Sequence, residues 1–241
     1  MSAVPRQAVV LAAGLGTRLR PITDTIPKPL VRVGGKPMLD WVLDALEEVG
    51  VEKVFLNVHH LADQIESHVA KRNSPDITIS DERRELLDSG GGVEKILPLM
   101  NPAPFFLLNS DTFWLDDEEP NLSRLASTWD DRTMDMLLML AKPEQATGHG
   151  AKTDFLREPA GRLARSPNRE SGYIYAGAAI IHPRIFERSA RGRHSLNVEF
   201  DAAIAKGRLF GWLMHGKWLT VGTPDAIESA ETVIRQFRMS A

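Results

Sequence analysis

The chain has 241 residues, 43% hydrophobic and 25% charged, which is ordinary for a soluble globular protein of one large or two small domains. Its net charge of −3, from 29 basic and 32 acidic residues, provides no basic field for nucleic acid. It contains no cysteine, which excludes disulfides and thiolate metal sites and is compatible with a reducing cytosol. The apolar runs are far shorter than the roughly 20 residues that cross a membrane, and no cleavable signal is recognisable. We therefore expect a cytoplasmic protein without nucleic-acid or membrane partners.

The first half of the chain alternates the patterns of strands and helices. Short continuous apolar runs indicate buried strands, and apolar residues spaced three and four apart indicate amphipathic helices. The expected strands cover residues 8–13, 53–58, 77–80, 104–111 and 134–140, and the expected helices cover 37–49, 62–71, 93–97 and 122–129. This alternation predicts an α/β fold with a mainly parallel sheet and right-handed crossovers.

The pattern changes after Ala141. The expected elements are hairpin strands at 154–156 and 162–164, a strand at 173–181, helices at 184–187 and 198–205, strands at 209–214 and 218–221 around a turn, and a final helix at 223–237. Gly177, inside the long strand, indicates a close approach of another backbone. We expect this half to cover the carboxyl edge of the sheet, within one domain over residues 1–241.

A glycine loop follows the first strand. Gly14 and Gly16 allow a sharp turn in which consecutive backbone N–H groups approach an anion without an intervening Cβ. Arg18 and Arg20 add fixed positive charge, and arginine suits forked contacts with phosphate oxygens. The alternative is a surface turn with scattered charge, but the density of these residues beside one buried strand favours a loop that binds a polyphosphate.

The next residues are rich in proline. Prolines on both sides of Lys28 predict that this lysine lies on a stiff, extended loop. Two common phosphate motifs do not fit. A dinucleotide fingerprint requires glycine where Leu19 stands, and a Walker loop requires Ser or Thr where Pro37 follows Gly35-Lys36.

An apolar strand ends in Asn109-Ser110-Asp111, which places a carboxylate at the edge of the sheet where ligands bind in open α/β folds. An aspartate beside a polyphosphate is most simply a Mg²⁺ ligand, because Mg²⁺ takes one or two carboxylates together with phosphate oxygens. The alternative is an aspartate that caps the next segment.

Two further motifs have competing interpretations. The glycines 90–92, just before the helix expected at 93–97, offer either a close backbone approach at a helix N-terminus or a flexible hinge. His59-His60 at a strand exit could bind a metal, but no third ligand lies at suitable spacing, which favours local hydrogen bonding.

Together these residues suit nucleotidyl transfer, in which an acceptor phosphate attacks the α-phosphorus of a nucleoside triphosphate and expels pyrophosphate. Such a reaction needs positioning and charge neutralisation rather than a covalent nucleophile. We assign the N–H groups near Gly14 and Gly16 to the triphosphate and Arg18 to the leaving pyrophosphate. Lys28 would hold the α-phosphate or the incoming phosphate, and Asp111 would hold Mg²⁺.

At these same residues the chain resembles the sugar-1-phosphate nucleotidyltransferases. Their signature Gly-x-Gly-Thr-Arg-Leu-x-Pro followed by Pro-Lys-Pro-Leu stands here at 14–21 and 27–30, and the likeness continues through 89–92, 109–111 and 221–224. The resemblance implies a Rossmann-like three-layer nucleotidyltransferase fold with a mainly parallel mixed central sheet, Mg²⁺ dependence, and an ordered reaction with a sugar 1-phosphate. Residues 1–140 would form the nucleotide-binding half and 141–241 the sugar-phosphate-binding half.

Within this family the chain looks most like the short bacterial N-acetylmuramate 1-phosphate uridylyltransferases. The features that carry this are Glu-x-Leu-x-Ser-Gly-Gly-Gly at 85–92, Gly-His-Gly then Asp-Phe within 148–155, and the lack of the C-terminal β-helix domain that many relatives append. The resemblance implies that the nucleotide contacts Leu11, Ala13, Gly14, Gly16, Thr17, Glu85, Gly90 and Gly91. It implies that the sugar phosphate lies near Asn109, Asp154, Gly177 and Asn197.

One position departs from the family pattern. Relatives commonly carry a second Mg²⁺-binding aspartate in the segment Trp-x-Asp-x-Gly-Thr, where this chain has Thr220. A hydroxyl binds Mg²⁺ weakly or through water and removes one negative charge from the site. Either Mg²⁺ binds through Asp111, water and phosphates, or activity is reduced.

Three alternatives follow. The substrates are mannose or glucose 1-phosphate with another base; or the chain is a non-catalytic nucleotide-sugar sensor, which only Thr220 favours; or it is a dinucleotide-binding oxidoreductase, which Leu19 disfavours. The leading expectation is an enzyme that uses UTP and a sugar 1-phosphate as a monomer or small homo-oligomer.

Overall fold

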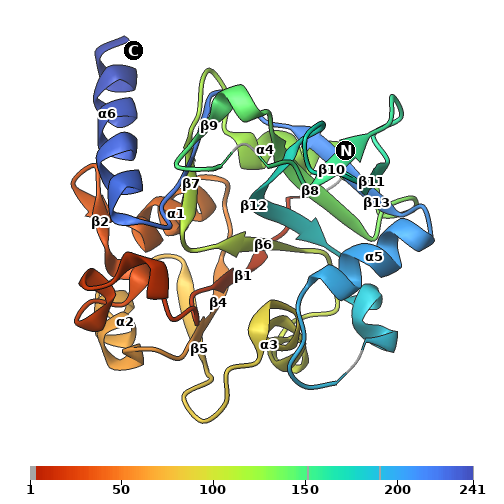
Figure 1. The fold of residues 1–241 in the computed structure, drawn as a ribbon. Coiled ribbons are helices and arrows are strands. Elements are labelled where there is room, and N and C mark those ends of the chain that lie inside the picture. Colours follow the sequence, from red (N-terminus) through yellow and green to blue (C-terminus); the bar gives the residue numbers. More distant parts are fainter. Residues whose placement is uncertain (1–3, 151, 190, 241) are drawn as a thin grey trace.

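The computed structural model describes residues 4–150, 152–189 and 191–240. Its largest element is a seven-stranded sheet (Figure 1). The strands of this sheet are β1 (Gln7–Leu11), β4 (Lys53–Val58), β5 (Asp76–Asp81), β6 (Phe105–Asn109), β8 (Met136–Ala141), β12 (Ile174–Ile181) and β13 (Leu209–Leu213). Their order is β13-β8-β12-β6-β1-β4-β5. Only β12 runs antiparallel to its two neighbours, β6 and β8, so the mainly parallel mixed sheet is confirmed.

Helices cover both faces of this sheet. One face packs against α1 (Met38–Glu48), α2 (Ala62–Val69) and α4 (Asn121–Thr128), and the other packs against α3 (Asp88–Ile96) and α5 (Asn197–Ala205). Successive strand residues point to opposite faces, so Val10 joins the first core and Val9 the second. Figure 1 shows α3 and α5 side by side. The three-layer α/β arrangement is therefore confirmed.

A smaller sheet continues from the carboxyl end of β6. It consists of β7 (Thr112–Leu115), β14 (Lys217–Thr220) and β9 (Ala146–Thr147), in the order β7-β14-β9. The last helix, α6 (Pro224–Ser240), shares a third hydrophobic core with β7, β14 and the segment after β1. Two short hairpins complete the strands: β2 (Arg32–Val33) with β3 (Lys36–Pro37), and β10 (Phe155–Arg157) with β11 (Leu163–Arg165).

The strands expected at 209–214 and 218–221 are confirmed as β13 and β14, which join the large and the small sheet respectively. Three other local expectations differ from the structure. The segment expected to be extended around Lys28 contains three 3₁₀ turns, Thr17–Leu19, Ile22–Asp24 and Lys28–Leu30. The helix expected at 184–187 is a 3₁₀ helix, Pro183–Arg188. Helix α3 begins at Asp88 rather than after the glycines, so these lie inside it.

The described residues contain no helix whose length and apolar character would allow it to cross a membrane.

Candidate active site

A pocket of about 500 Å³ opens at the carboxyl ends of β1 and β6, the edge where ligands bind in open α/β sheets. The predicted site residues that line it are Leu11, Ala13, Gly14, Gly16, Thr17, Arg18, Lys28, Asn109 and Asp111. These come from two separate stretches of the chain, which the parallel pairing of β1 with β6 brings together. The pocket is therefore formed mainly by the two motifs that the sequence singles out.

The glycine loop is shaped around Gly16. Its φ of 64° is in the left-handed region, and a Cβ there would lie 2.9 Å from the Thr23 side chain and 3.0 Å from Cβ of Lys28. Thr23 in turn donates a hydrogen bond of 2.8 Å to the Gly16 carbonyl. A side chain at position 16 would therefore be strained and would displace Lys28.

Arg18 reaches the opposite wall of the pocket. A Cβ at Gly222 would lie 3.1 to 3.3 Å from the Arg18 guanidinium, so this group packs closely over the chain after β14. Both residues line the pocket. Arg18 and Gly222 therefore lie together in one part of the pocket wall.

The centre of the pocket holds an ion pair between Lys28 and Asp111, with 2.5 Å between Nζ and Oδ2. The lysine side chain is 11% exposed and that of the aspartate 33% exposed. The turn that carries Asp111 is fixed, because Ser110 donates from its N–H and its hydroxyl to the Leu11 carbonyl at 3.1 and 2.7 Å. Lys28 and Asp111 are therefore close enough to act on the same phosphate group.

Thr220 is close to this pair along the backbone, but it is not among the residues that line the pocket. Its Cα pairs with that of Thr112, and Val221 N–H donates to the Asp111 carbonyl at 3.1 Å. Among the described residues, no group of three or more His, Cys, Asp or Glu side chains could hold a metal. One carboxylate and room for phosphates nevertheless fit Mg²⁺, which accepts one carboxylate and completes its shell with phosphate and water oxygens.

The loop Gly148-His149-Gly150 packs against the backbone of Thr220. Gly148 has a φ of 77°, and a Cβ there would lie 2.1 Å from the Thr220 carbonyl oxygen, so only glycine fits. The His149 ring packs against Trp218 with 5.4 Å between centroids. Burial lowers the pKa of His149, opposed by the charge of Asp154, so this imidazole is neutral at pH 7.

Of the residues expected near the sugar, Asn109 lines the pocket and Gly177 packs behind it. The φ of Gly177 is 76°, and a Cβ would lie 2.3 Å from Thr112 Oγ1 and 3.1 Å from Asn109 Nδ2, so side chains approach this glycine closely, and not another backbone as the sequence indicated. Asp154 and Asn197 are outside the pocket lining and are engaged elsewhere. Asp154 accepts hydrogen bonds from Arg169 and from the Tyr175 N–H, and Asn197 accepts one from Arg165. Their contact with a sugar stays a prediction.

The residues expected near the base are arranged differently from the sequence interpretation. Glu85 is exposed on the turn between β5 and α3. A Cβ at Gly90 would lie 2.5 Å from the His194 ring, and one at Gly91 would lie 2.4 Å from the Gly192 carbonyl. The close approach is therefore made by another segment of the protein, and the hinge interpretation is wrong because these glycines are helical. Asp88 and Ser89, in the first turn of α3, face the pocket instead.

The histidine pair makes local hydrogen bonds, as the sequence favours. His59 Nδ1 is 2.7 Å from the Glu82 carbonyl, and His60 Nε2 is 2.8 Å from the Thr23 carbonyl.

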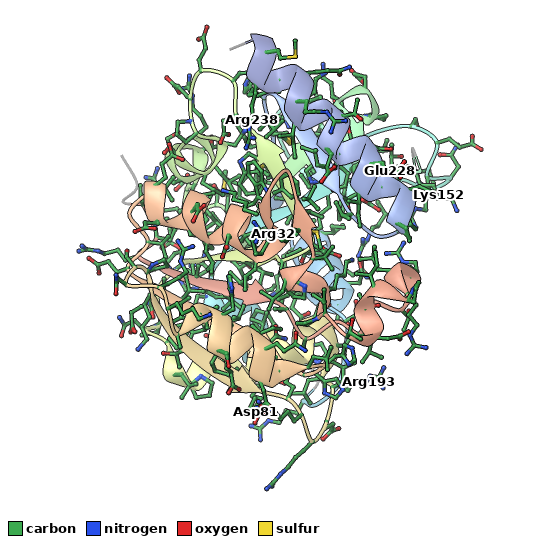
Figure 2. All side chains as sticks on the ribbon, turned by 90° about the vertical axis from the view of Figure 1, so that its left-hand side faces the viewer. Arg32, Asp81, Lys152, Arg193, Glu228 and Arg238 are labelled. Carbon is green, nitrogen blue, oxygen red and sulfur yellow. The ribbon has the colours of Figure 1, made fainter. Side chains whose placement is uncertain are left out.

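Two lining residues lie outside the motifs that the sequence singles out. Asn57 is the penultimate residue of β4, and a polar residue near the carboxyl end of an apolar strand could have revealed it. Arg193 comes from the loop before α5, and Figure 2 shows it at the rim of the molecule, below the turns that follow β1. No local pattern around Arg193 predicts this position.

The fold and the pocket define a nucleotide-binding α/β protein arranged for transfer at a phosphate. The chain belongs to the nucleotidyl transferase family, whose model matches residues 7–236.

Two curated relatives cover nearly the whole chain. It is 38% identical over 236 residues to the N-acetylmuramate alpha-1-phosphate uridylyltransferase of Caulobacter vibrioides, which covers 96% of this chain and 98% of that protein. It is 30% identical over 230 residues to the protein of the same name from Neisseria meningitidis, covering 94% and 97%. Among solved structures, the inositol-1-phosphate CTP transferase from T. maritima has the same fold, with a TM-score of 0.77, 19% identity and coverage of 97% and 98%.

Proposed function

We propose that the chain transfers the uridylyl group of UTP to N-acetylmuramate 1-phosphate, with Mg²⁺, and releases pyrophosphate. The observation that carries this proposal is the Lys28–Asp111 pair beneath the glycine loop, in a pocket of nucleotide size. The identity of 38% to the Caulobacter vibrioides uridylyltransferase, over almost the full length of both chains, supports the choice of substrates. Both substrates are charged metabolites, so we place the reaction in the cytoplasm.

In this reaction an oxygen of the acceptor phosphate forms a bond to the α-phosphorus of UTP. The bond from that phosphorus to the bridging oxygen breaks, and pyrophosphate leaves with the bridging oxygen. Backbone N–H groups from Gly14 to Thr17 would bind the triphosphate, and Arg18 would neutralise the charge that develops on the pyrophosphate. Lys28 would exchange its partner Asp111 for the α-phosphate and hold it in line with the acceptor.

Asp111 and Thr220 would hold Mg²⁺, which when bound neutralises phosphate charge and orients the oxygens around the α-phosphorus. Asn109 lines the pocket, and a Cβ at Gly177 would lie 3.1 Å from Asn109 Nδ2. These two residues would shape the space for the sugar. The reaction thus requires no covalent intermediate from the chain's own residues.

The test is pyrophosphate release with Mg²⁺, with each nucleoside triphosphate paired in turn with N-acetylmuramate, glucose and mannose 1-phosphates. We expect release that requires both UTP and the muramate phosphate. Release with another pair would retain the chemistry and overturn the substrates. No release with any pair, despite measurable UTP binding, would instead identify a nucleotide-sugar sensor, and would implicate Thr220.

A further inference from the structure

A buried pair of polar side chains, Asn57 and Glu82, connects two walls of the pocket. We propose that this pair is a positioning unit, which holds the start of the glycine loop and the loop before α3 in the one relative geometry that binds the nucleotide. The inference rests on the proposed function, because it concerns the nucleoside triphosphate site. Neither side chain is a catalytic residue.

The contacts form a continuous path. Asn57 Oδ1 accepts a hydrogen bond of 2.7 Å from the N–H of Ala12, the first residue after β1. Asn57 Nδ2 donates to Glu82 Oε1 at 2.8 Å, and Glu82 Oε2 accepts from the N–H of Leu87 at 3.0 Å. Ala12, Leu86 and residues 88–89 line the pocket. The path therefore begins at Ala12, before the glycine loop, and ends at Leu87, in the segment that forms another wall of the pocket.

Both members are deeply buried, at 2% exposure for Asn57 and 1% for Glu82. Within the described part of the chain, Glu82 forms no ion pair, and N–H donors alone meet its carboxylate. Burying a carboxylate without a neighbouring cation costs free energy. A carboxylate is nevertheless suited to this position, because two N–H donors there each need an acceptor. A carboxylate fills that need here because each of its oxygens faces one N–H group.

The helix packed above is shaped to leave room for this pair. A Cβ at Gly92 would lie 2.8 Å from Asn57 Nδ2 and 2.9 Å from Glu82 Oε1. The third glycine of the run is thus accounted for by the pair, whereas Gly90 and Gly91 are accounted for by the loop at 192–194.

The pair is not needed to hold the sheet together. The backbone ladder already joins β4 to β5 as far as Val58 and Asp81, and Glu82 N–H bonds to the Val58 carbonyl at 2.8 Å. What the Glu82 side chain adds is a connection to Leu87, on the far side of the exposed turn at 83–85. Loss of the Glu82 carboxylate should therefore change the geometry of the pocket more than the packing of the core.

The donor and acceptor pattern permits an exchange of the two groups. In Glu82→Gln, the new amide cannot accept from both Asn57 and Leu87, so one buried donor loses its partner. In Asn57→Asp, a second carboxylate faces that of Glu82. In the double variant Asn57→Asp with Glu82→Gln, the carboxylate now on β4 accepts from Ala12 and from the new amide, whose oxygen accepts from Leu87. Every hydrogen bond is restored with the same total charge.

The experiment measures UTP binding by calorimetry in the wild type, both single variants and the double variant, with thermal melting as a measure of folding. We expect each single variant to weaken UTP binding by at least about tenfold, and the double variant to recover binding to within about threefold of the wild type. Binding of the sugar 1-phosphate alone should change by less than about threefold in all of them.

Asp135→Asn is the matched control, since it makes the same carboxylate-to-amide change at a side chain 4% exposed, at the amino edge of β8. The inference is overturned if the single variants bind UTP normally, if Asp135→Asn weakens UTP binding equally, or if the double variant fails to recover. Should a single variant not fold, the double variant still decides, because it must fold and bind UTP.

Wild-type turnover is scored separately from these binding measurements. A wild type that binds UTP but releases no pyrophosphate would refute the proposed function while the binding comparison still tests the pair.

Discussion

Replacing Lys28 by alanine should have opposite effects on turnover and on Mg²⁺ affinity. Two unit charges about 4 Å apart, at an effective dielectric constant of about 20, attract each other by about 4 kcal/mol. Because the Asp111 side chain is 33% exposed, solvent screens much of this attraction. Removing the lysine frees a carboxylate of charge −1, and we expect Mg²⁺ to bind about tenfold more tightly, which corresponds to about 1.4 kcal/mol.

Turnover should fall in the same variant. Lys28 is the cation placed to stabilise charge at the transferring phosphate, and loss of one such group costs at least about a hundredfold in kcat. Mg²⁺ affinity is measured by calorimetric titration without nucleotide, and turnover is measured by pyrophosphate release at saturating substrates and Mg²⁺. The control is Lys36→Ala, which removes a lysine bonded to Asp44 at 2.7 Å outside the pocket. A kcat within tenfold of wild type, or a weakened Mg²⁺ affinity in Lys28→Ala, would refute this reasoning.

Three other substitutions test the structure around the site. Gly177→Ala should lower the free energy of unfolding by about 2–4 kcal/mol in urea melts, because its Cβ would lie 2.3 Å from Thr112 Oγ1 at a positive φ. Gly35→Ala is the control, since Gly35 has a positive φ with nothing within 4 Å of its Cβ position, and should lower that free energy by about 1 kcal/mol. Burial raises the pKa of Asp135, but hydrogen bonds from two arginines outweigh it and hold that pKa below its ordinary value. The stability that its ionised form confers is therefore present above about pH 4 and lost as pH falls through the lowered pKa, so the unfolding free energies of wild type and Asp135→Asn should converge on acidification. Thr220→Asp should lower the Mg²⁺ concentration needed for half-maximal turnover and change kcat by less than about tenfold; a gain of a hundredfold would show that the natural site is impaired.

Most of the fold could be predicted because its strands are short apolar runs between clear turn signals. The strand expected at 53–58 matches β4, and the one at 77–80 lies within β5. The position of the glycine loop in the pocket could be predicted for a similar reason, since its glycines, Arg18 and Lys28 are close together in the sequence. Asp111 could be placed beside them because parallel strands bring their carboxyl ends to one edge.

What could not be predicted depends on contacts between distant residues. Glycine destabilises a helix interior, so a run of three glycines predicts an interruption of the helix. Helix α3 nevertheless continues through the run, because His194, Gly192 and the Asn57–Glu82 pair pack against it too closely for a Cβ. Tertiary packing overrides the intrinsic preference. The same applies to β14, whose partners β7 and β9 lie far away in the sequence, whereas the adjacent β13 pairs with β8.

Thr220 is best understood together with the charge balance at the centre of the pocket. Lys28 neutralises Asp111 in the unliganded protein, and a second carboxylate at position 220 would leave one negative charge without a partner there. With threonine, the Lys28–Asp111 pair has no further carboxylate added to it, and the triphosphate brings the oxygens that Mg²⁺ requires. Metal binding would then depend on bound nucleotide more strongly in the wild type than in Thr220→Asp. In the absence of UTP, Mg²⁺ should therefore bind weakly to the wild type and measurably more tightly to Thr220→Asp, and equal affinities in titrations without nucleotide would show that the hydroxyl plays no part in this balance.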